Sequence, residues 1–208
     1  MKTVNAGARL DRLPTSSFHD RMLGLIGGGM FLDAFEIYLQ GAVLAALLGL
    51  GWSTPAQNAN FISITFAGMV VGAWFAGILG DRRGRRFSYQ ANLLIFGLAS
   101  LAGAAAPSMN WLIVARFVMG VGLGAEIVVG YVTIAEFVPP SSRGMWGSAL
   151  AVITNSSLFF SALIARLVIP NIGWRWMFVI VGIGALIVWQ LRKRMPESPR
   201  WLSPRANG

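Results

Sequence analysis

A run of 44 consecutive uncharged residues lies between Glu36 and Asp81, and a second run of 29 lies between Arg86 and Arg116. A helix that crosses the hydrocarbon core of a bilayer needs about 20 predominantly apolar residues. Residues 22–191 carry only 13 charged side chains, and 55% of the whole chain is hydrophobic. The sequence therefore predicts several spans in a lipid bilayer. It does not fit a soluble enzyme, a nucleic-acid-binding protein or a disordered tail.

Prolines and one cluster of charges divide this block into helices, because proline removes a backbone donor and clashes with the preceding turn. We place the junctions at Pro55, the charged run 81–86, Pro107, the pair Pro139 and Pro140, and Pro170. The spans lack the polar and apolar alternation of a transmembrane strand. We therefore expect an all-α fold with an N-terminal segment at 1–21, a six-helix bundle at 22–191 and a tail at 192–208. The six helices are expected near residues 22–49, 58–79, 87–106, 111–138, 145–169 and 175–191.

Basic residues are distributed unequally between the two ends of this predicted bundle. The N-terminal segment, the second and fourth junctions and the C-terminal tail hold 14 of the 17 lysines and arginines. Cytoplasmic segments of membrane proteins carry such an excess. We therefore expect a multi-pass protein of the inner (plasma) membrane with both termini in the cytoplasm. Because Met22 begins a stretch too long for a signal peptide, we expect the first span to be retained.

Residues 77–86 read Gly-Ile-Leu-Gly-Asp-Arg-Arg-Gly-Arg-Arg, which resembles the signature loop of the major facilitator superfamily without departures. The segments 116–122, 136–144 and 196–202 are similar to the sugar-porter and metabolite:proton symporter branches of that family. The resemblance covers nearly the whole chain, but only the first six of the family's twelve helices. It implies the N-terminal half of a secondary transporter whose partner is a C-terminal half or a second copy of the chain.

The resemblance also implies that the loop and the stretch from Glu136 to Arg143 form a gate on the cytoplasmic side. A purely structural role fits the same residues, because the arginines anchor the cytoplasmic face and Asp81 favours the dipole of the third helix. Both interpretations are kept. The candidate gate residues are Gly77, Asp81, Arg82, Gly84, Arg85, Arg86, Glu136 and Arg143.

Asp33, Glu36 and Gln40 share one stripe of the first predicted helix, since residues three and four apart are neighbours on a helix. A carboxylate near the bilayer centre is costly, so this stripe is expected to face a wet cavity or a charged partner. Depth along the helices makes Arg116 of the fourth span the expected partner of Asp33. In the resembling symporters such a pair couples proton movement to conformational change, because moving the arginine alters the proton affinity of the acid. A static pair that only holds two helices together is the alternative.

Glu126 lies ten residues beyond Arg116 and is a candidate second proton site or substrate contact, or simply a glutamate bonded to a neighbouring helix. The candidate substrate-cavity residues are Glu36, Gln40, Asn155 and Arg166. Arg166 also has the alternative of reaching the membrane interface. The fifth span lacks the glutamines that hold hexoses in the resembling sugar porters. We therefore favour an organic or aromatic acid over a sugar as the solute.

Catalytic and metal-binding chemistry has little support in this sequence. There is no cysteine, and the single histidine, His19, lies outside the apolar block. We expect no enzyme activity, no metal or other cofactor and no nucleic-acid partner. The expected partners are a small-molecule substrate, protons and the lipid bilayer. A truncated remnant or a membrane subunit that does not transport is the alternative to a transporter.

Overall fold

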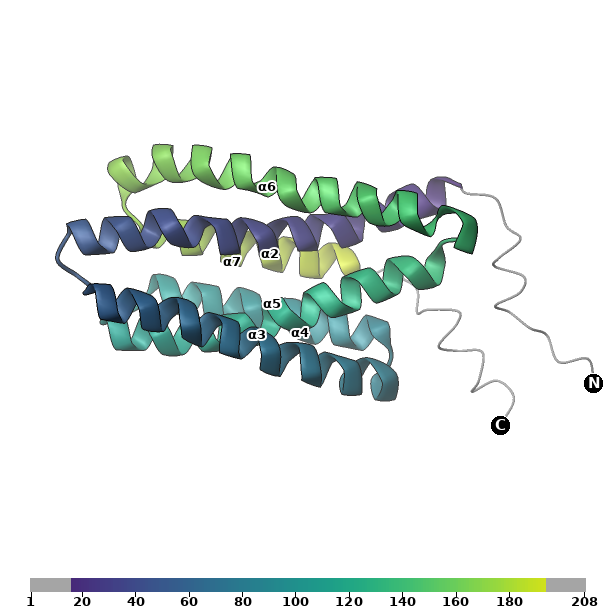
Figure 1. Ribbon diagram of the computed structural model, residues 1–208, viewed down its shortest axis with the longest axis horizontal. Coiled ribbons are helices and arrows are strands. Elements are labelled where there is room, and N and C mark those ends of the chain that lie inside the picture. Colours follow the sequence, from purple (N-terminus) through teal and green to yellow (C-terminus); the bar gives the residue numbers. More distant parts are fainter. Residues whose placement is uncertain (1–15, 194–208) are drawn as a thin grey trace, which may run out of the picture.

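The computed structural model describes residues 16–193, and within them six long helices run back and forth along one axis (Figure 1). The helices are α2 (Ser17–Gly49), α3 (Pro55–Arg83), α4 (Arg85–Ala104), α5 (Met109–Phe137), α6 (Arg143–Ile172) and α7 (Arg175–Arg192), with a short 3-10 turn, η1 (Pro140–Ser142), before α6. All six are long and apolar enough to cross a membrane. The expected all-α class with six spanning helices is confirmed.

Local sequence signals explain where several helices begin. The side chain of Thr54 accepts a hydrogen bond from the backbone N–H of Gln57, and Pro55 occupies the first turn of α3, where its missing donor costs nothing. Ser108 caps α5 in the same way by accepting from the backbone N–H of Trp111. Gly84 alone separates α3 from α4 with a φ of 94°, a conformation that glycine adopts readily. The charged run 81–86 therefore lies mostly inside two helices.

One predicted junction is wrong, because Pro170 lies inside α6 and the helix continues to Ile172. Pro170 removes only one donor in the last turn of the helix, which ends two residues later at Ile172 and is capped by Gly173. The first helix also begins at Ser17, earlier than the expected residue 22. The remaining bounds of the helices differ from the expected ones by a few residues.

Packing of the helices places α2 and α5 at the centre of the bundle. α5 packs against α3, α4 and α2, whereas α2 also packs against α6 and α7. In Figure 1 the start of α2, the junctions α3–α4 and α5–α6, and the end of α7 lie at one end of the bundle. We call this the basic end, since Arg21, Arg82, Arg85, Arg143 and Lys193 all lie there.

Candidate functional site

Five charged side chains are buried within the apolar bundle. They come from three helices: Asp33 and Glu36 from α2, Arg116 and Glu126 from α5, and Arg192 from α7. Charged groups inside a membrane protein are costly unless they pair with one another or face a cavity. The contacts of these five groups therefore define the candidate site.

Glu36 and Arg116 form a completely buried ion pair between α2 and α5. Arg116 Nη1 donates to Glu36 Oε1, and Arg116 Nε donates to the hydroxyl oxygen of Thr65 on α3 at 3.2 Å. The guanidinium carbon also lies 4.7 Å from the centre of the Phe61 ring. Arg116 is thus held by three helices, and its charge is neutralised inside the bundle.

This pairing differs from the expected one, in which Arg116 contacts Asp33. Residues 33 and 36 are three positions apart, so their side chains leave α2 about 60° apart and about 4.5 Å apart along the axis. The packing of α2 turns Glu36 toward α5 and leaves Asp33 one turn nearer the basic end. The expected pair was based on how deep each residue lies along its helix. Depth does not determine how α2 is rotated about its own axis, and this rotation decides which acid faces Arg116.

A second buried ion pair joins Glu126 of α5 to Arg192, the last residue of α7. Arg192 Nη1 donates to Glu126 Oε1, while Nε and Nη2 donate to the backbone oxygens of Leu25 and Ile26 on α2, each at 2.8 Å. The guanidinium carbon lies 4.7 Å from the centre of the Tyr89 ring on α4. Arg192 therefore links α7 to three other helices.

Sequence reasoning missed Arg192, because its position after the last apolar residue assigns it to the tail. The signal that was available is Glu126, a buried acid that needed a cation. An arginine in the last turn of a span is long enough to fold back into the bundle. Glu126 itself was expected to be functional or to bond to a neighbouring helix, and the structure gives it this contact.

Asp33 is the third acid of the site, and it has no ion-pair partner in the described part of the chain. Only 2% of the residue is exposed, and neither carboxylate oxygen has a hydrogen-bond partner among the described residues. Asp33 lines a hollow of about 170 Å³ between α2, α5 and α6. The other lining residues are Met30, Ala34, Ile37, Tyr38, Ile127 and Thr154.

The four expected substrate-cavity residues lie in different surroundings. Asn155 on α6 is exposed and accepts a hydrogen bond at 3.1 Å from the hydroxyl of Tyr38, which lines the hollow. Gln40 is buried on α2 and Glu36 is paired with Arg116, and neither lines the hollow. Arg166 is exposed on α6 and does not line the hollow either. The structure therefore brings only Asn155 to the edge of the space beside Asp33.

The expected gate residues gather at the basic end, where Arg85 joins three of the elements. Its guanidinium contacts Asp81 at 3.0 Å and Glu136 at 3.1 Å, so it links the end of α3 and the start of α4 to the end of α5. Arg86 donates to the backbone oxygen of Lys193 at 2.6 Å, which links α4 to the end of α7. Ionic contacts therefore join Asp81, Arg85 and Glu136 in the described residues, and their role as a gate stays a prediction.

The other gate residues lie around this network. Arg82 is in the last turn of α3, and Gly84 makes the turn into α4. Gly77 faces open space, so it is not required there by close packing. Arg143 begins α6, and its Nε is buried without a hydrogen-bond partner in the described structure.

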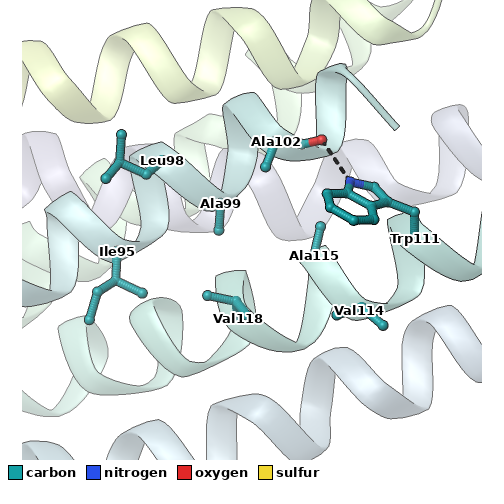
Figure 2. Close-up of a pocket in the computed structure, with 8 residues that line it drawn as sticks. All are labelled: Ile95, Leu98, Ala99, Ala102, Trp111, Val114, Ala115 and Val118. Carbon is teal, nitrogen blue, oxygen red and sulfur yellow. Dashed lines mark hydrogen bonds between the residues drawn. The ribbon is translucent and has the colours of Figure 1, made fainter. Parts of the chain in front are cut away.

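A larger hollow of about 400 Å³ lies between α4 and α5 (Figure 2). Its lining side chains are Ile95, Leu98, Ala99, Ala102, Trp111, Val114, Ala115 and Val118. The indole N–H of Trp111 donates to the backbone oxygen of Ala102 at 3.2 Å, so the two polar groups drawn there bond to each other. The hollow therefore offers no recognition group for a polar solute, and the smaller hollow beside Asp33 is the better candidate. Among residues 16–193, no group of three histidine, cysteine or acidic side chains could hold a metal ion.

Comparisons with known proteins agree with this architecture. The inner membrane metabolite transport protein YdjE of Escherichia coli K12 is 45% identical over 198 residues, a region that covers 95% of this chain and 44% of YdjE. The niacin transporter NiaP of Acinetobacter baylyi is 35% identical over 195 residues, which cover 94% of this chain and 44% of NiaP. The chain thus spans less than half the length of these relatives.

The solved structure of the proton:xylose symporter XylE bound to 6-bromo-6-deoxy-D-glucose superposes with a TM-score of 0.82 at 19% sequence identity. The superposition covers 92% of this chain and 48% of XylE, so the fold is that of half of such a transporter. Residues 26–207 match the family model described as Major Facilitator Superfamily. With its six spanning helices and its metabolite-transporting relatives, the chain belongs to the Major Facilitator Superfamily, in the branch of the sugar porters and metabolite symporters.

Proposed function

We propose that this chain forms one half of a proton-coupled secondary transporter for a small polar metabolite. The observation that carries the proposal is Asp33, a buried acid without a partner in the described residues that lines a hollow between three helices. An ionisable group in such a place is typical of a proton or solute pathway. The relatives named as metabolite and niacin transporters support the same class of activity.

The other wall of the pathway comes from a second six-helix unit. In transporters of this kind the substrate lies between two repeats near the bilayer midplane, and access alternates as one repeat rocks against the other. The chain covers less than half of its relatives, which supports a C-terminal half as this unit. Because an even number of spans returns the chain to its starting side, a second copy in the same orientation is the other candidate.

The proposed solute is an organic or aromatic acid, with a sugar as the alternative. The name of NiaP supports the aromatic acid, since niacin carries a carboxylate on an aromatic ring. Neither Arg116 nor Arg166 lines the hollow, because Arg116 is paired with Glu36 and Arg166 lies exposed on α6. The cation that recognises an acid is therefore assigned to the second half.

The proposed location is the inner membrane with both ends of the chain in the cytoplasm. The excess of arginine at the basic end supports this orientation. The name of YdjE as an inner membrane protein supports the location.

Uptake by cells tests the proposed function. The 208-residue chain is expressed alone and as a hybrid in which it replaces the first half of NiaP, and accumulation of radiolabelled niacin, other organic acids and pentoses is measured. We expect accumulation that a protonophore abolishes, and we expect Asp33→Asn to prevent accumulation while substrate exchange continues. The exposed Asp20→Asn change on the same helix is the matched control. If both preparations reach the membrane folded and neither accumulates any solute, the chain is a subunit that does not transport.

A further inference from the structure

The number of buried charges leaves one acid of the bundle without a cation. Within the helices the described structure buries three carboxyl groups, those of Asp33, Glu36 and Glu126, but only two guanidinium groups, those of Arg116 and Arg192. Each guanidinium contacts one carboxylate. In a medium of low dielectric a surplus charge is expensive, so a neutral arrangement requires one proton on these acids.

Geometry divides the five groups into two units. The charges of Glu36 and Arg116 balance each other, because both side chains are fully buried and in contact. Arg116 and Glu126 are ten residues apart on α5, or about 15 Å along the helix, so the two guanidiniums lie at different depths. Asp33 therefore belongs electrostatically with whichever pair lies nearer to it.

The surroundings of Gly29 and the lining of the hollow together relate Asp33 to the Glu126–Arg192 pair. Gly29 precedes Asp33 by one turn of α2, and a Cβ atom added to it would lie 2.1 Å from Arg192 Nη2 and 2.7 Å from Glu126 Oε1. Met30 and Ile127, which adjoin Gly29 and Glu126 in sequence, line the hollow together with Asp33.

We propose that Asp33, Glu126 and Arg192 form one proton-binding unit, in which two carboxyl groups share a single guanidinium and hold one proton between them. This inference rests on the proposed function and names the residues that carry its proton step. The proton enters as H⁺ from water, converts one carboxylate of the unit to a carboxylic acid, and leaves again as H⁺. Arg192 is a positioning residue that sets how many protons the two acids hold.

Other titratable groups around the unit are few. On α2 they are Glu36, already paired, and Tyr38, which donates its hydroxyl to Asn155. On α4 the hydroxyl of Tyr89 donates to the backbone oxygen of Val129 at 3.0 Å. α6 lines the hollow only with Thr154, which is not titratable. The proton balance of the unit therefore depends on its own three members.

Infrared spectroscopy of the purified 208-residue chain in lipid nanodiscs tests the unit without any substrate, because a protonated carboxyl has its own C=O band. At neutral pH we expect the band of one buried carboxylic acid in the unmodified chain, and none in Asp33→Asn, where Glu126 and Arg192 neutralise each other. We also expect the band to vanish in Glu126→Gln, since Asp33 then has Arg192 to itself. The exposed Asp20→Asn change should leave the band unaltered.

Glu126→Gln is the deciding variant. If Asp33 is protonated merely because it is buried, the band persists in Glu126→Gln, and that result overturns the shared unit. Arg192→Gln should double the band area, because both acids then lose their cation, and Arg192→Lys should restore the single band. If Arg192→Gln fails to fold, Glu126→Gln and Arg192→Lys still decide the question.

This test separates the two proposals. A band that follows the expected pattern in a chain whose hybrid transports nothing leaves the proton-binding unit standing and removes the proposed function. If proton-driven uptake is observed and the band persists in Glu126→Gln, the proposed function stands and the proton-binding unit is overturned.

Discussion

The ion pair of Glu36 and Arg116 places opposite charges where neither residue has any exposed surface. Such a pair contributes little net stability compared with apolar residues of similar volume, but loss of one partner leaves an uncompensated buried charge. Its expected role is therefore to fix how α2, α3 and α5 meet. Asp33, one turn away, has no ion-pair partner among the described residues. Its carboxyl group can therefore gain or lose a proton without breaking an ion pair between helices.

Breaking the Glu36–Arg116 pair from one side should be more damaging than removing both charges. We expect Glu36→Gln or Arg116→Gln to lower the free energy of unfolding by about 3–5 kcal/mol, and the double variant to be less destabilised than the sum of the two. Thermal unfolding followed by tryptophan fluorescence measures this. Arg166→Gln, which removes an exposed arginine of the same bundle, is the control. Strictly additive effects would show that the two side chains are not coupled.

Gly28 and Gly29 provide a matched pair of positions beside the second ion pair. A Cβ at Gly28 meets nothing within 4 Å, whereas one at Gly29 would overlap Arg192 and Glu126. Gly28→Ala should therefore stabilise the helix by up to about 1 kcal/mol, because alanine is the better helix former. Gly29→Ala should destabilise the chain by about 1–3 kcal/mol, because it forces Arg192 out of its place. Equal melting temperatures for the two variants would contradict the position given to Arg192.

Four of the five charged residues of the site could be found from the sequence, but their partners could not. Asp33, Glu36, Arg116 and Glu126 stand out because each is ionisable within an apolar span. Which acid faces Arg116 depends on the rotation of α2 about its axis, which side-chain packing decides. Arg192 was missed because its side chain folds back from the end of α7 into the bundle. The sequence shows that its backbone follows the last apolar residue, but not where its side chain points.

At the scale of the helices, close approach of backbones joins α3 to α5. A Cβ at Gly72 would lie 1.9 Å from the backbone oxygen of Val121, and one at Gly124 would lie 2.0 Å from that of Met69. Small residues permit such contact between membrane helices, where dispersion forces and weak polar contacts replace the hydrophobic effect. The density of glycine in these two helices predicts a close interface, but not which glycines form it.

Gly72 and Gly77 on the same helix separate the glycines that pack from those that do not. Gly77 faces open space. Gly72→Ala should push α3 away from α5 and lower the melting temperature, whereas Gly77→Ala should leave it unchanged or raise it slightly. Thermal unfolding of the purified chain compares them directly. A loss of stability in Gly77→Ala equal to that in Gly72→Ala would mean that both glycines are packed.

Across the bundle, α3 and α6 are the two least covered of the six long helices in the described residues. In their most apolar windows α3 is 22% buried and α6 is 17% buried, whereas α5 is 61% buried. The faces that α3 and α6 leave uncovered are the ones that lipid, or the second six-helix unit proposed above, would contact. α6 also contributes Thr154 to the hollow beside Asp33. A unit seated against α6 would therefore lie next to the site.

Orientation in the membrane is testable because the chain contains no cysteine, so that a single introduced cysteine reports one position. Asn110 is exposed at the end of the bundle opposite the basic end, and Ser141 is exposed at the basic end. The excess of arginine predicts that the basic end is cytoplasmic. A membrane-impermeant maleimide should therefore label Asn110→Cys in intact spheroplasts, and it should label Ser141→Cys only after the membrane is opened.

Labelling of both positions in closed spheroplasts would indicate mixed insertion, and the reverse pattern would place the arginines outside. The outcome bears on assembly as well as on location. If every copy inserts with the basic end inward, two copies can pair about an axis along the membrane normal and present identical hollows to each other. If the copies insert in both orientations, random pairing gives that arrangement in only about half of all pairs.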